Sequence, residues 1–167
     1  MKKVIELDFE FKDAKIITRV RLKPKKGKKS LPYDAIFDTG CSKTTMSKDL
    51  FNTLGYIAKK AQAVKIIGIN GESDGFSTII DNFTIGNENL GDVRVTVTDM
   101  QEQFNNSIIL GMNILMWFNT QIHYTKKKIT LAERVVEGYT TTRFTRGDTN
   151  SIMLLIIQDS EDEFEQM

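Results

Sequence analysis

One short run of this sequence has the residue types that acid–base chemistry requires. Asp38, Thr39 and Gly40 stand in a row, and the aspartate supplies a carboxylate that can act as a general acid or a general base. By average residue usage the triplet arises by chance in about one chain in thirty of this size. The weight of the triplet therefore depends on the residues around it.

Its surroundings indicate that a strand delivers the triplet into a loop. The apolar run 35–37 (Ala-Ile-Phe) leads directly into Asp38, and small or hydroxyl residues follow within 41–45. Later in the chain, 109–115 contains a second apolar run that ends in a glycine (Ile-Leu-Gly) and continues as Met-Asn-Ile-Leu. Between them, the segment 67–71 (Ile-Gly-Ile-Asn-Gly) contains Asn-Gly, the strongest short signal for a β-hairpin turn.

These three segments, in this order and at this spacing, resemble the retropepsin-like aspartic proteases, the single-domain relatives of retroviral proteases. The resemblance covers the chain from about Lys15 to Leu131. It implies an all-β acid-protease fold, a closed barrel with one or two short helices. It also implies hydrolysis of peptide bonds with neither a cofactor nor a metal.

Peptide hydrolysis of this kind needs two carboxylates that share one proton, and aspartic proteases are the standard example. Two like charges a few ångströms apart cannot both ionise easily, so one carboxylate activates a water and the protonated one polarises the scissile carbonyl. This chain has a single Asp-Thr-Gly and no Asp-Ser-Gly. The resemblance therefore implies an aspartic endopeptidase that acts as a homodimer, in which a two-fold axis brings Asp38 to its own copy.

The resemblance also assigns roles around the catalytic residue. Thr39 would hydrogen-bond across the dimer axis, and Gly40 would let the backbone approach the water and the substrate. The hairpin would close as a flap over an extended peptide, through Ile67, Gly68, Ile69, Asn70 and Gly71. The residues that would pack beneath the catalytic loop and hold it rigid are Ile109, Leu110 and Gly111.

The rest of the chain predicts mostly strands, because it has ten Phe, many Ile, Val and Thr, and only two Pro. Ser47 can cap a helix that carries Leu50, Phe51 and Leu54 on one face and ends at Gly55, and 113–118 is a second helix candidate. Segments 83–85 and 93–98 are expected to form one hairpin. The predicted strands are 4–11, 15–22, 31–37, 64–69, 76–80, 83–85, 93–98, 107–111, 121–124 and 128–131.

The character of the sequence changes near residue 137. We predict that 1–137 forms the protease domain and that 138–167 forms a C-terminal extension. Within the extension, 152–157 has the apolar character of one more strand, and 159–166 is acidic and expected to fray.

The composition of the chain limits the classes of partner and of binding site that we expect. The chain of 167 residues fits one domain, and 23 Lys+Arg against 22 Asp+Glu remove any argument from bulk charge for a nucleic-acid partner. One Cys and one His exclude an internal disulfide and an ordinary structural zinc site. Apolar runs such as 152–157 are too short to span a bilayer, and acidic residues occupy the place of a signal peptide. We expect a peptide or protein substrate, a second copy as partner, no membrane and a cytoplasmic setting.

Two other chemistries fit the residues less well. Cys41 and His123 are the residue types of a thiol protease, but His123 lies in a strand-like segment and is expected on the strand surface. The run 40–44 has some likeness to a phosphate-binding loop, yet that motif needs glycine where Phe37 and Ser42 stand. Nucleotide binding is therefore excluded.

Some alternatives stay open. A chain that keeps this fold without activity would be a peptide-binding or dimerisation module. Cys41 stands where the family usually has Ala or Ser, and Met112 stands where retroviral members often have Arg. The lysine-rich segment 23–29 is expected to be a solvated loop, with an anionic docking patch as the alternative. Gly75 is a candidate hinge for the hairpin.

Overall fold

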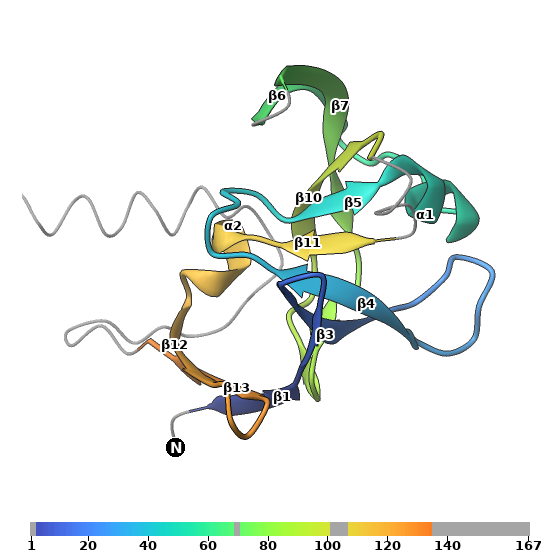
Figure 1. Ribbon diagram of the computed structural model, residues 1–167. Helices are drawn as coiled ribbons and strands as arrows, with labels where there is room; N and C mark the ends of the chain where they lie inside the picture. Colours follow the sequence, from blue (N-terminus) through green and yellow to red (C-terminus); the bar gives the residue numbers. More distant parts are fainter. Residues whose placement is uncertain (1–2, 69–70, 101–106, 135–167) are drawn as a thin grey trace, which may run out of the picture.

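The protein is mainly β, with two short helices in the part that the computed structural model describes, residues 3–68, 71–100 and 107–134 (Figure 1). This confirms the predicted fold class. The helices are α1 (Lys48–Thr53) and α2 (Met112–Leu115). The strands are β1 (Val4–Asp8), β2 (Glu10–Lys12), β3 (Lys15–Leu22), β4 (Leu31–Phe37), β5 (Thr45–Ser47), β6 (Gln62–Gly68), β7 (Gly71–Ile80), β8 (Thr84–Ile85), β9 (Glu88–Asn89), β10 (Val93–Thr98), β11 (Ile108–Leu110), β12 (Phe118–His123) and β13 (Lys128–Glu133).

The strands form a large and a small sheet. The large sheet runs β6-β7-β10-β5-β11-β4-β3-β8-β9, with β2 also paired to β3, and the small one runs β1-β13-β12. Most pairs are antiparallel, but β5 lies parallel to β10, and β11 lies parallel to β4. Closure of the large sheet into a barrel stays a prediction.

Alternation of apolar and polar residues sets which face of each strand is buried. In β3, Val20 and Leu22 are fully buried while Arg19 and Arg21 are exposed, the period of two that a half-buried strand requires. The same alternation buries Ile5 and Leu7 in β1 and Ile129 and Leu131 in β13, so the small sheet adds one face to the common core.

The first predicted strand is divided in two. β1 pairs with β13 of the small sheet, whereas β2 pairs with β3 of the large one. Phe9 lies between them, and its backbone N–H donates to the carbonyl of Lys127 at 3.1 Å. The chain therefore changes sheets at Phe9, which a continuous alternating pattern does not reveal.

The predicted partner of 93–98 was wrong. β8 pairs with β9 in a small hairpin of its own, around Gly86 in the left-handed region at φ +58°. β10 instead pairs antiparallel with β7 and parallel with β5. A turn signal fixes only the residues beside it, so it was correct for the short hairpin and could not identify the partner of β10.

The helix over 48–53 begins and ends where the sequence predicts. The hydroxyl of Ser47 accepts the N–H of Leu50 at 3.2 Å, and Gly55 adopts φ +68° just after the last turn.

Within the described segments, no helix is both long and apolar enough to cross a membrane.

Candidate active site

Asp38 follows the last residue of β4, at the start of the loop that leads to β5, and its side chain is half-buried. Its backbone N–H donates to the carbonyl of Leu110 at 3.2 Å. This bond continues the parallel pairing of β4 with β11, in which Phe37 lies opposite Leu110. The backbone of the proposed catalytic residue is thus fixed by a strand from the other half of the chain.

The carboxylate of Asp38 also orders its own loop, residues 38–44, which we call the catalytic loop. The backbone N–H of Gly40 donates to Oδ1 of Asp38 at 2.8 Å, and the N–H of Cys41 donates to the Asp38 carbonyl at 3.3 Å. Thr39 and Gly40 are exposed in the single chain. The two bonds from Gly40 and Cys41 therefore fix the start of the loop around Asp38.

The segment 109–111 lies directly against this loop. A Cβ atom on Gly111 would come within 2.6 Å of the Lys43 carbonyl and within 2.8 Å of the Cys41 carbonyl oxygen, so no larger residue fits there. Just after it, the N–H of Met112 donates to the Cys41 carbonyl at 2.7 Å. The structure therefore brings the two sequence motifs together.

β6 and β7 form the hairpin proposed as the flap, and they pair as far as Gly68 and Gly71. Residues 69 and 70, part of the predicted flap tip, lie outside the described residues. β7 pairs with β10 only from Gly75 onward, so 71–74 have β6 as their partner and project from the sheet (Figure 1). Ile67, at 81% exposure, presents an apolar side chain on this projecting end.

Two polar residues, one at the end of the catalytic loop and one in α2, had no role in the sequence-based prediction. Thr44 is fully buried and Asn113 is half-buried, and they join the loop to α2 and to β10. Both stood inside the quoted motifs, but the bond between them links residues far apart in sequence, which a single sequence cannot indicate.

The structure describes no contact between Cys41 and His123, the two residues of the thiol-protease alternative. The Cys41 thiol donates to the Lys43 carbonyl at 3.0 Å within the same loop. His123 ends β12 as an exposed strand residue, as expected. Among the residues described, no group of three or more His, Cys, Asp or Glu is placed to hold a metal ion.

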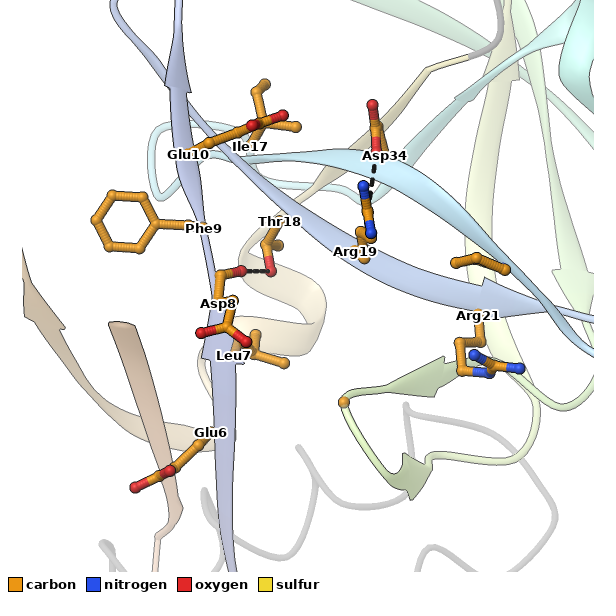
Figure 2. A pocket seen from close by; sticks show the side chains of 12 residues that line it. Glu6, Leu7, Asp8, Phe9, Glu10, Ile17, Thr18, Arg19, Arg21 and Asp34 are labelled. Atoms are coloured by element: carbon orange, nitrogen blue, oxygen red, sulfur yellow. Dashed lines mark hydrogen bonds and ion pairs between the residues drawn. The ribbon is translucent and has the colours of Figure 1, made fainter. Parts of the chain in front are cut away.

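A groove of about 520 Å³ lies between β1–β2 and β3–β4, lined by residues other than those of the catalytic loop (Figure 2). Arg19 and Asp34 form an ion pair across its floor at 3.6 Å, and the Thr18 hydroxyl donates to the Asp8 carbonyl at 2.8 Å. Asp8 further pairs with Lys128. The groove therefore combines carboxylates with arginines, one pair of which is joined by an ion pair, and this differs from a carboxylate dyad.

The clearest pKa shifts belong to a cluster around Asp81. Hydrogen bonds from Lys25 and Lys59, both at 2.8 Å, hold the pKa of the Asp81 carboxyl below its ordinary value. The bond to Asp81 raises the pKa of Lys59 in return. Burial raises the pKa of the nearby Tyr56 phenol to about 12. This cluster ties the lysine-rich segment 23–29, which is exposed as predicted, to the end of β7.

The chain is similar to known aspartyl proteases. The family model described as "Aspartyl protease" matches residues 25–114, which is 90 of the 167 residues. The crystal structure of a retropepsin-like aspartic protease from Rickettsia conorii has 18% identity and a TM-score of 0.53, covering 80% of this chain and 94% of that one. EIAV protease in complex with the inhibitor HBY-793 has 24% identity and a TM-score of 0.49, covering 62% of this chain and 88% of that one.

A comparison with curated protein sequences finds no match. The family match includes the Asp-Thr-Gly triplet, the β6–β7 hairpin and Gly111 in one continuous stretch, and the Rickettsia structure shares the fold. The chain belongs to the aspartyl protease family, and it has the fold of a retropepsin-like protease.

Proposed function

We propose that the protein is an aspartic endopeptidase, active as a homodimer in which Asp38 of each subunit contributes one carboxylate. The observation that carries this proposal is the placement of Asp38. It stands at the end of β4, its backbone is bonded to Leu110 and its loop is packed on Gly111. A carboxylate held so rigidly needs no reorganisation when it meets a second one.

The two Asp38 carboxylates would together hydrolyse the peptide bond. Two carboxylates that share a proton offer one base to take a proton from water and one acid to polarise the scissile carbonyl. Attack by the water gives a tetrahedral intermediate, and return of the proton to the amide nitrogen releases the two products. Thr39 would bridge the two loops, and Gly40 would allow close approach of the substrate backbone.

The β6–β7 hairpin would cover the proposed substrate cleft on the side opposite the two Asp38 carboxylates. An extended peptide pairs readily with a projecting β-hairpin, and the exposed side chain of Ile67 favours apolar substrate residues. Closure of two such hairpins, one from each subunit, would exclude water from the reacting atoms. Peptides and proteins are therefore the proposed substrates.

The extent of the domain and its setting stay predictions. The boundary at 137 and the predicted strand at 152–157 lie outside the described residues. The cytoplasmic setting is inferred from the composition of the chain alone.

The direct test replaces Asp38 by asparagine. Asp38→Asn keeps the size of the side chain but removes the shared proton, so peptide cleavage is expected to fall by about a thousandfold or more. Asp34→Asn is the matched control, because Asp34 lies on the same strand with an exposed side chain. Equal cleavage by Asp38→Asn and the wild-type protein would refute the mechanism.

A second measurement separates an enzyme from a peptide-binding module. An aspartic protease binds a peptide mimic that carries a hydroxyl in place of the scissile carbonyl far more tightly than the parent peptide, because the mimic resembles the tetrahedral intermediate. Equal affinity for the two peptides would favour the binding module.

A further inference from the structure

We propose that Thr44 and Asn113 are positioning residues, which hold the catalytic loop in its reactive geometry by joining it to the strand that carries the flap hairpin. The proposal rests on the proposed function in so far as it concerns catalysis. We call the hydrogen bonds of Thr44 and Asn113 the clamp. They lie within one chain, so the clamp can be tested without any turnover.

Thr44 ends the catalytic loop and uses all of its polar groups there. Its side chain is 0% exposed, and its hydroxyl accepts the backbone N–H of Gly111 at 3.1 Å. Its own N–H donates to Oδ1 of Asn113 at 2.6 Å, and its carbonyl accepts the N–H of Thr96 at 2.9 Å. One buried residue thus joins the loop to Gly111, which follows β11, to α2 and to β10.

Asn113 makes the complementary set of bonds from α2. Its backbone N–H donates to the Ser42 carbonyl at 3.1 Å, in the middle of the catalytic loop. Its side chain accepts from Thr44 through Oδ1 and donates through Nδ2 to the carbonyl of Arg94 at 3.0 Å. The side-chain amide therefore bridges the loop and β10 with one acceptor and one donor, which fits the chemistry of asparagine and of no isosteric residue.

β10 continues this connection to the hairpin. On its other edge β10 pairs with β7 over the whole of Val93–Thr98, and the Thr98 hydroxyl donates to the Asp74 carbonyl at 3.0 Å. The same strand thus holds the base of the flap hairpin on one side and the end of the catalytic loop on the other. Loosening of the Thr44–Asn113 contacts would let the loop move relative to the hairpin.

The chain contains a reporter for this loop. Cys41 is the single cysteine in the sequence, and its half-buried thiol donates to the Lys43 carbonyl within the loop. Because the chain has one cysteine, the rate of its reaction with a disulfide reagent such as 5,5′-dithiobis(2-nitrobenzoate) reports on the accessibility of this loop and of no other part of the chain. The rate can be measured on the full chain at one fixed pH.

The first variant is Thr44→Val, which keeps the volume and removes the acceptor for Gly111. The second is Asn113→Asp, which keeps Oδ1 for Thr44 but points a second oxygen at the Arg94 carbonyl. Thr44→Ser restores the hydroxyl. The matched control is Thr78→Val, because Thr78 is another fully buried threonine whose hydroxyl makes one bond, to the Lys59 carbonyl at 2.9 Å.

We expect Thr44→Val and Asn113→Asp to raise the modification rate of Cys41 by about fivefold or more, since an opening free energy lower by 1 kcal/mol gives that factor. Thr44→Ser and Thr78→Val should match the wild-type rate. Circular dichroism checks that each variant is folded. If Thr44→Val does not fold, the Cys41 rate of Asn113→Asp decides whether the clamp exists, because aspartate is isosteric with asparagine. An unchanged Cys41 rate in a folded Asn113→Asp variant would overturn the clamp.

Activity provides the second readout. If the wild type cleaves peptides, Asn113→Asp should lower kcat by about tenfold with little change in KM at enzyme concentrations that keep the dimer assembled, while the exposed-site control Asp34→Asn keeps kcat. An unchanged kcat together with a faster Cys41 reaction would refute the positioning role. A wild type that cleaves no peptide would contradict the proposed function, and the Cys41 rates would still decide whether the clamp exists.

Discussion

The backbone N–H of Asp38 donates to the carbonyl of Leu110, and through this bond the first residue of the catalytic loop is aligned with a strand from the other half of the chain. The parallel pairing of β4 with β11 places the two motifs side by side.

Gly111→Ala should destabilise the protein by about 1–3 kcal/mol. The added Cβ would lie 2.6 Å from the Lys43 carbonyl, and a backbone group on a packed loop cannot yield as a flexible side chain can. Urea denaturation measures the loss. A free energy of unfolding equal to that of the wild type would mean that the loop is not packed on Gly111 as described.

Gly75→Ala should displace the flap hairpin. A Cβ there would come within 2.5 Å of the Val97 carbonyl oxygen, at the point where β7 leaves β10. We expect a loss of about 1–3 kcal/mol in unfolding free energy and a lower kcat/KM for peptides. Ser73→Ala, two residues further along the exposed hairpin, is the control and should stay within about 0.5 kcal/mol of the wild type. Equal stability of the two variants would exclude the close contact.

The sequence predicted the elements better than their partners. β3 and β4 have the predicted bounds, and the cap at Ser47 is in place, because period-two alternation and capping chemistry depend on neighbouring residues. The partner of β10 was wrong, and the change of sheet at Phe9 was missed. Both depend on contacts between residues far apart in the sequence.

The same limit applies to the site. Asp38, Thr39 and Gly40 are recognisable because their types and order carry chemistry. Thr44 and Asn113 are ordinary polar residues in a sequence, and only the fold brings them to 2.6 Å from each other. The flap residues Ile69 and Asn70 lie outside the described part of the chain, so their role stays a prediction.

Asp81→Asn should remove the ion pairs with Lys25 and Lys59. The free energy of unfolding is expected to fall by roughly 1 kcal/mol at neutral pH, since the pairs are partly exposed. The folded state lowers the pKa of Asp81 below its ordinary 3.8, so its stabilisation is complete above about pH 5 and is lost as the pH falls through the lowered pKa. Urea denaturation from pH 7 to pH 3 should show the gap between wild type and variant shrinking. Glu72→Gln, in an exposed pair with Lys65, is the control with little effect. A gap that is constant with pH would contradict the assignment.

Tyr56→Phe should change how stability responds to alkali. Burial raises the pKa of this phenol from 10.0 to about 12, so the unfolded chain ionises first and the wild type loses stability as the pH rises from 10 towards 12. At neutral pH the variant loses the bond from the hydroxyl to the Lys23 carbonyl, worth about 0.5–1.5 kcal/mol. Denaturation curves at pH 8 and pH 11 should therefore show the deficit of the variant narrowing. A deficit that stays the same would mean that Tyr56 ionises equally in both states.

The most direct test of the shared dyad mixes two proteins. Wild-type chains and Asp38→Asn chains are combined in equal amounts, allowed to exchange subunits, and assayed at the same total concentration as the wild type alone. If one active site needs Asp38 from both subunits, only wild-type pairs cleave, and random association leaves about one quarter of the activity. A remaining activity of about one half would show that each subunit works with its own carboxylate, and the shared-proton account would be wrong.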